Sequence, residues 1–228
     1  MEGMPERENI MYHLAEEDNM KIIDNYRDLP IGMYLEICEI DRRTDIDELH
    51  KQVCIISLLT GMAEEDVYNL PIGEYKVLAA KSQFLTKEYD GEVLTAKTYI
   101  VDGWTLIPVE DFRKITTAQY IDFQTFAAEG EKRIVEILST MLVPKGKKYN
   151  QDYDIIELQE ALRRSLSVAD ALTLFAFFFV KFHQLMRDSL ISSKEIVRKM
   201  KDKEKKKALM ERIQEAENSL RGGVGLPM

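Results

Sequence analysis

The string Leu-Pro-Ile-Gly-x-Tyr occurs twice in this chain, at residues 29–34 and again at residues 70–75. In both copies a proline precedes apolar residues at helical spacing. Proline is tolerated at the start of a helix because the N–H group that it lacks would have no partner within the helix. The repeated string therefore predicts that two helices of this protein open in the same way.

A wider similarity relates three helical segments in each half of the chain, an opening, a middle and a closing helix. The segments are residues 29–40, 53–59 and 70–85 in the first half, and residues 115–126, 135–141 and 166–181 in the second half. A duplicated three-helix unit would explain the similarity, and so would the shared composition of short, capped amphipathic helices. Both explanations stay open from the sequence alone.

Apolar residues recur at three- and four-residue spacing along most of the chain, and further helices are expected over 131–142, 155–165 and 168–190. Around Asp102-Gly103 the pattern changes to β-branched and aromatic residues, and this dipeptide favours a two-residue hairpin turn. We therefore predict a mainly α protein made of short-helix bundle units, with one β-hairpin near residues 92–108 and a long C-terminal helix.

These patterns predict five successive segments. They are an acidic arm (1–20), a first helical unit (21–88), a β-hairpin with a second helical unit (89–192), a charged helix (193–221) and a flexible tail (222–228). The arm is inferred from charge, because the first 50 residues hold 14 acidic and five basic side chains and the opening has few apolar residues.

Composition argues against several classes of function. With 40 acidic and 31 basic residues the net charge is −9, which would repel nucleic acid from most of the surface. The basic stretch 199–207 includes two acidic residues and no aromatic residue for stacking on bases. The longest apolar run, 171–180, is shorter than the roughly 20 residues that a membrane-spanning helix needs. With two cysteines and no secretory signal, we expect a cytoplasmic protein that binds neither nucleic acid nor membrane.

Candidate catalytic and metal-binding residues are few. His50 and Cys54 lie four residues apart and could share a helix face, with Cys38 as a third ligand, but no fourth ligand is evident. Cysteines packed in the core are the plainer interpretation, so no metal or cofactor is predicted. His13, His50 and His183 are not accompanied by a strained nucleophile turn. The protein is therefore not expected to be an enzyme, although an enzyme whose active site carries no recognisable sequence motif is an alternative hypothesis.

Residues 29–37, 55–67 and 70–75 resemble the helical pattern of tailed-bacteriophage tail assembly chaperones. In that family a Leu-Thr-Gly string, an acidic pair, a Leu-Pro pair and an aromatic residue follow a short helix. The corresponding residues here are Leu59-Thr60-Gly61, Glu64-Glu65, Leu70-Pro71 and Tyr75. The hairpin at 99–107 and residues 116–123 are similar to structural-module proteins of phages that infect Bacteroides-type hosts.

This resemblance implies a phage protein, made in the host cytoplasm, that binds other virion proteins through grooves between its helices. A tape-measure, neck or capsid component would be the partner, and self-association into a homo-oligomer is also compatible with it. Two roles stay open: a transient tail assembly chaperone, or a permanent virion subunit of the neck, ring, tail or internal capsid. The candidate partner-binding residues are Tyr34, Tyr75, Trp104 and Tyr120. The 11 methionines and nine phenylalanines fit an ordinary core or an adaptable groove.

Overall fold

A computed structural model describes residues 22–87, 89 and 98–222 of the chain. These residues are mainly helical, which confirms the predicted fold class. The predicted acidic arm, up to residue 20, lies outside the described residues. So does the predicted tail, except for Gly222, with which the last helix ends.

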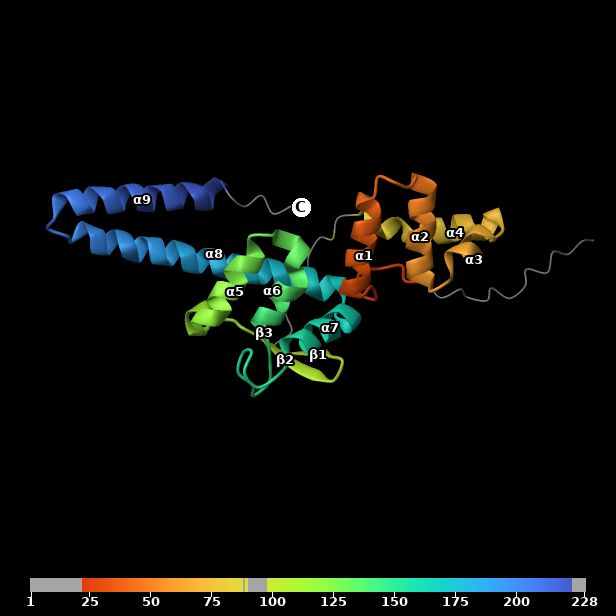
Figure 1. The fold of residues 1–228 in the computed structure, drawn as a ribbon, viewed down its shortest axis with the longest axis horizontal. Coiled ribbons are helices and arrows are strands. Elements are labelled where there is room, and N and C mark those ends of the chain that lie inside the picture. The colour runs from red at the N-terminus through yellow and green to blue at the C-terminus, as the bar shows by residue number, and fades with distance from the viewer. Residues whose placement is uncertain (1–21, 88, 90–97, 223–228) are drawn as a thin grey trace, which may run out of the picture.

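The first helices lie together on the right-hand side of Figure 1. They are α1 (Ile31–Arg42), α2 (Glu48–Thr60), α3 (Glu64–Tyr68) and α4 (Ile72–Ser82), the last continued by a 3-10 turn (Gln83–Thr86). Pro30 and Pro71 are the N-cap residues of α1 and α4, so both copies of the repeated string open a helix, as predicted. Asp47 caps α2, and Gly61 ends it with a φ of 74°. The short helix α3 was not predicted.

The predicted hairpin is present. Strand β1 (Tyr99–Val101) pairs antiparallel with β2 (Trp104–Pro108), and Asp102 and Gly103 make the turn with φ values of 46° and 82°. Residues 92–97 of the predicted hairpin lie outside the described residues. A third strand, β3 (Leu142–Pro144), pairs antiparallel with β2. The sequence predicted a helix up to Leu142 and then a loop, so this strand corrects that prediction.

The second group of helices forms the left-hand side of Figure 1. It comprises α5 (Thr117–Ala127), a 3-10 turn (Gly130–Arg133), α6 (Ile134–Met141), α7 (Ile155–Ser165), α8 (Val168–Arg198) and α9 (Lys203–Gly222). Thr116 and Gln119 form the capping box that opens α5. In each half the predicted middle helix contacts the opening and the closing helix: α2 contacts α1 and α4, and α6 contacts α5 and α8.

The boundary between the last two helices differs from the prediction. We expected one helix to end near Leu190 and the next to begin at Ser193, but α8 continues to Arg198. The polar residues after Leu190 fit a helix without interrupting it. A capping side chain follows only at Asp202, whose Oδ1 accepts hydrogen bonds from the amides of Glu204 and Lys205, both at 3.1 Å.

The apolar side chains form a larger and a smaller core. The larger core joins α1 to the sheet and to α5–α8, and its largest fully buried members include Phe123, Leu138, Met141, Leu142, Leu158 and Phe178. The smaller core lies between α2, α3 and α4, and its buried residues are Val53, Ile56, Val67 and Leu78. Helix α1 thus shares a core with the sheet and with helices that follow it by more than 50 residues.

The start of α1 is joined to the start of α8 by backbone hydrogen bonds. The Ile31 amide donates to the Leu166 carbonyl oxygen, and the Val168 amide donates to the Leu29 carbonyl oxygen, both at 2.8 Å. All four of these side chains are buried. This bridge fixes the first turn of α1 against the larger core.

Candidate functional site

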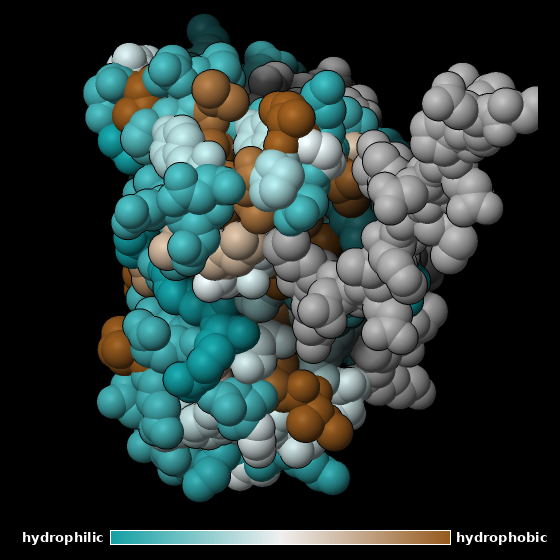
Figure 2. Space-filling model, turned by 90° about the vertical axis from the view of Figure 1, so that its right-hand side faces the viewer, coloured by the Kyte–Doolittle hydropathy of each residue, from teal (hydrophilic) through white to brown (hydrophobic). Residues whose placement is uncertain are grey.

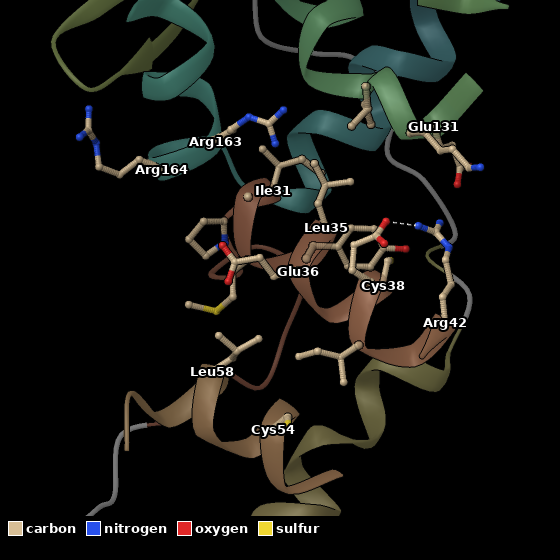
Figure 3. Close-up of a pocket in the computed structure, with 18 of the residues that line it drawn as sticks. Ile31, Leu35, Glu36, Cys38, Arg42, Cys54, Leu58, Glu131, Arg163 and Arg164 are labelled. Atoms are coloured by element: carbon tan, nitrogen blue, oxygen red, sulfur yellow. Dashed lines mark hydrogen bonds and ion pairs between the residues drawn. The ribbon is translucent and has the colours of Figure 1, made fainter. Parts of the chain in front are cut away.

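The best candidate for a binding site is a groove that follows α1, which we call the α1 groove. Its volume is about 930 Å³, within the range of pockets that hold ligands in proteins. Figure 3 shows α1 at its centre, with Leu58 and Cys54 of α2 on one flank and Arg163 and Arg164 of α7 on the other. The lining includes residues from both ends of α1, so the groove extends along the whole helix.

A glycine fixes the wall of this groove. Gly32 lies so close to α7 that an added Cβ would stand 2.7 Å from the Arg163 carbonyl oxygen. Any larger residue would force the two helices apart, because the Arg163 carbonyl group belongs to the backbone and cannot rotate away. Gly32 therefore sets the distance between α1 and α7.

The groove combines apolar side chains with balanced charge. Its apolar lining includes half-buried Leu35, Leu58 and Leu172. Its charged lining consists of five acidic and five basic residues: Glu36, Glu39, Glu64, Glu131, Glu160, Arg42, Arg43, Lys132, Arg163 and Arg164. Such a lining suits a partner segment with an apolar face and both signs of charge along its edges.

Tyr34 and Cys38 face this groove from α1. Burial raises the pKa of the Tyr34 phenol well above its ordinary value, and the hydrogen bond to Cys38 adds to the rise. Burial also raises the pKa of the Cys38 thiol, which outweighs the opposing effect of that hydrogen bond. Both groups are therefore protonated at neutral pH, so Cys38 is not an activated nucleophile.

Two of the four candidate partner-binding residues come from the repeated string. Tyr34 lines the α1 groove, and its ring packs edge-on against Tyr26 with centroids 6.3 Å apart. Tyr75 lies on α4 instead, where its hydroxyl donates to Gln52 Oε1 at 2.8 Å. Both rings are half-buried, and they belong to different cores.

The other two candidates lie elsewhere. Trp104 packs edge-on against Tyr153 beside the sheet, with centroids 6.0 Å apart. The Tyr120 hydroxyl on α5 contacts Met186 Sδ at 3.5 Å. The four predicted residues thus contact separate sets of neighbours, and the structure does not bring them together into one site.

A cluster that the sequence suggested only in part lies at the edge of the α1 groove: His50 and Cys54 were paired as possible ligands, but Glu64 was not expected. One atom each of His50, Cys54 and Glu64 lies within 4.8 Å of the others. Cys38, which the sequence suggested as the third member, is not part of this cluster. Burial and the hydrogen bond to the Glu64 carboxylate both raise the pKa of the Cys54 thiol. Gly61 was the sequence feature that could have predicted the third member, because a glycine at the end of α2 lets the chain turn back and place Glu64 near that helix.

The face that carries α2–α4 holds exposed apolar side chains, namely Leu49, Tyr68, Ile72 and Val77. Figure 2 shows this end of the molecule, where apolar residues stand as separate spots among hydrophilic ones. Scattered apolar side chains of this kind are usual on protein surfaces. They do not make this face a better candidate than the α1 groove.

Helix α8 is the one helix among the described residues that is long and apolar enough to cross a membrane. A buried core helix has the same length and composition. The first half of α8 contributes Leu174, Phe175 and Phe178 to the larger core. Packing within the protein thus accounts for part of its apolar character, since 33% of its most apolar 18-residue window is buried.

Comparisons with protein-family models, with curated proteins and with solved structures found no match to this chain.

Proposed function

We propose that this chain is a non-enzymatic bacteriophage morphogenesis protein, similar to tail assembly chaperones, that binds a helical segment of another virion protein. The α1 groove is the observation that carries the proposal. A partner segment from a tape-measure, neck or capsid component would lie along α1, in the host cytoplasm during assembly.

The size of the groove supports a helical ligand. Helix α1 spans 12 residues, which at about 1.5 Å per residue is about 18 Å. A partner helix of three turns would cover that length and place apolar side chains on Leu35 and Leu58. Apolar burial yields about 25 cal/mol per Å² before the costs of ordering and association are subtracted.

A photo-crosslinking amino acid at position 58 tests this proposal in infected cells. Leu58 lines the groove and is half-buried. Ile121, an exposed apolar residue on α5 outside the groove, is the matched control position. We expect the probe at position 58 to crosslink to a helical segment of a phage structural protein, and the probe at position 121 to give no such product.

Two crosslinking outcomes would contradict the proposal. If both positions give the same products, or position 58 captures no phage structural protein, the α1 groove is not the binding site. If position 58 does crosslink to a phage structural protein, a synthetic peptide of that segment should bind the purified full chain, and Leu58→Lys should weaken this binding more than Ile121→Lys does.

A permanent virion subunit is the second candidate function. The observation that favours it is the helical hairpin of α8 and α9, which projects away from the rest of the protein in Figure 1. An ion pair between Lys194 and Glu217 joins its two helices, and the region from Ser193 onward carries more basic than acidic side chains. Mass spectrometry of purified virions separates the two roles, because a subunit is present in fixed stoichiometry whereas a transient chaperone is absent.

A further inference from the structure

We propose that His50, Cys54 and Glu64 bind a divalent metal ion of the zinc type, which clamps α2 to α3. The three side chains offer a nitrogen, a sulfur and an oxygen atom within 4.8 Å of one another. The proposal does not depend on any virion partner, although two of the three residues, Cys54 and Glu64, also line the α1 groove.

Two of the ligands are positioned by α2. His50 and Cys54 are four residues apart, so they lie on the same face of the helix, one turn from each other. Asp47 caps this helix by accepting a hydrogen bond from the His50 amide at 2.8 Å. The Tyr68 ring packs edge-on against the imidazole with centroids 6.0 Å apart, which limits how the imidazole can turn.

The third ligand is brought back to α2 by a tight turn. The Gly61 amide donates to the Ser57 carbonyl oxygen at 2.8 Å, and the Ser57 hydroxyl donates to the Met62 carbonyl oxygen at 2.6 Å. These bonds fix the connection so that Glu64, the first residue of α3, faces Cys54. The site is therefore held by backbone geometry on both sides.

The spacing suits a tetrahedral ion. Two ligand atoms bound about 2.0–2.1 Å from a tetrahedral zinc ion stand about 3.3 Å apart. His50 Nε2 and Glu64 Oε2 are 3.5 Å apart, close to this value. Small side-chain rotations would place the Cys54 sulfur about 2.3 Å from the ion, which is the usual length of a zinc–sulfur bond.

The ligand types favour zinc over magnesium or calcium, which prefer oxygen donors alone. Three protein ligands leave a fourth position for water. The nearby Arg43 guanidinium opposes a bound cation, but it forms an ion pair with Asp45 at 2.7 Å, which offsets much of its charge. Cys54 is buried, and His50 is half-buried, so two of the three ligands lie at least partly out of water.

The smaller core gives such a clamp a role. It has four buried residues, contributed by α2, α3 and α4, and α3 is only five residues long. Small cores often rely on a metal or a disulfide for stability. An ion that joins α2 to α3 would hold this unit together.

Titration of the metal-free, reduced full chain with Co²⁺ tests the proposal, because Co²⁺ reports its ligands by absorption. We expect one equivalent to give tetrahedral d–d bands and a thiolate-to-cobalt charge-transfer band, both abolished by Zn²⁺. Cys54→Ser should remove the charge-transfer band, and His50→Ala and Glu64→Gln should weaken binding about tenfold or more. At zinc a hundredfold above Kd, the unfolding midpoint should rise by about 5 °C.

Matched controls separate the site from general metal binding. Cys38→Ser removes the other cysteine, and Glu65→Gln removes the neighbouring exposed carboxylate; both variants should keep the cobalt spectrum. If Cys54→Ser does not fold, His50→Ala and Glu64→Gln change less buried side chains and carry the test. Cobalt binding without a thiolate band in the wild-type chain, or the same affinity in all variants, would overturn the proposal.

Discussion

The two copies of Leu-Pro-Ile-Gly-x-Tyr open helices in the same way but lie in opposite surroundings. In the first copy Ile31 is 0% exposed, whereas in the second copy the corresponding Ile72 is 69% exposed. The first copy is hydrogen-bonded to the start of α8, and Gly32 packs against the α7 backbone. Gly73 has nothing within 4 Å of the position where a Cβ would stand.

The string therefore determines where a helix begins, whereas the segments packed around that helix determine which of its side chains are buried. Local signals such as a proline at the N-cap act within a few residues. Burial of Ile31 depends instead on α7 and α8, which follow it by more than 120 residues. The same six-residue pattern is thus a core element in α1 and a surface element in α4.

Truncation of the two isoleucines should give the largest contrast. We expect Ile31→Ala to lower the free energy of unfolding by about 3–4 kcal/mol, because it removes a buried side chain and leaves a cavity. Ile72→Ala should change it by less than about 0.5 kcal/mol, since the side chain is exposed. Chemical denaturation of the two variants measures both values, and equal losses would contradict the assigned environments.

Substitution of the two glycines should change stability in opposite directions. Gly32→Ala should destabilise by about 2 kcal/mol, because the added Cβ would overlap the Arg163 carbonyl. Gly73→Ala should stabilise by about 0.5–1 kcal/mol, since alanine favours a helix and nothing opposes it there. Thermal unfolding of both variants checks the signs, and a stable Gly32→Ala variant would mean that α1 and α7 are further apart.

Removal of the N-cap side chains tests whether α2 and α5 are stabilised equally by their caps. Asp47 accepts from the His50 amide, and Thr116 accepts from the Gln119 amide. Asp47→Ala and Thr116→Ala should each cost about 1 kcal/mol. The control is Asp45→Ala, which removes an exposed ion pair with Arg43 and should change stability by less than about 0.5 kcal/mol. Loss of more stability in the control than in Asp47→Ala would refute the capping role.

The tyrosines of the two copies should respond differently to alkaline pH. Burial raises the pKa of Tyr34 and of Tyr75 above the ordinary value of 10.0, and the rise is larger at Tyr34. A raised pKa in the folded state stabilises the protein fully below the unfolded pKa, and this stability is lost as pH rises above it. Tyr34→Phe should therefore reduce the loss of stability between about pH 9 and pH 11, a range that brackets the ordinary tyrosine pKa of about 10, more than Tyr75→Phe does. Denaturant midpoints at the two pH values provide the measurement.

Features that depend on nearby residues could be predicted from the sequence. The Asp102-Gly103 turn, the Thr116 cap and the end of α2 at Gly61 each rest on the backbone preference of one or two residues. The span of α7 also matches its prediction, because Asp154 caps it and its apolar stripe has a clear helical period.

Features that depend on distant residues could not be predicted. Strand β3 follows directly from α6 without a polar turn, and it exists because β2 lies beside it. The meeting of Glu64 with His50 and Cys54 depends on how α3 packs on α2. The α1 groove likewise requires α7, and the residues near α1 contain no pattern that predicts that α7 packs beside it.

Hydrogen exchange of the amides of α1 and α4, measured by mass spectrometry on the full chain, tests most directly whether packing against distant segments makes α1 more stable than α4. We expect the amides of α1 to exchange slowly, near the rate set by global unfolding, because the larger core encloses the start of this helix. The amides of α4 should open with a clearly lower free energy. Equal protection of the two helices would mean that packing against distant segments does not distinguish them.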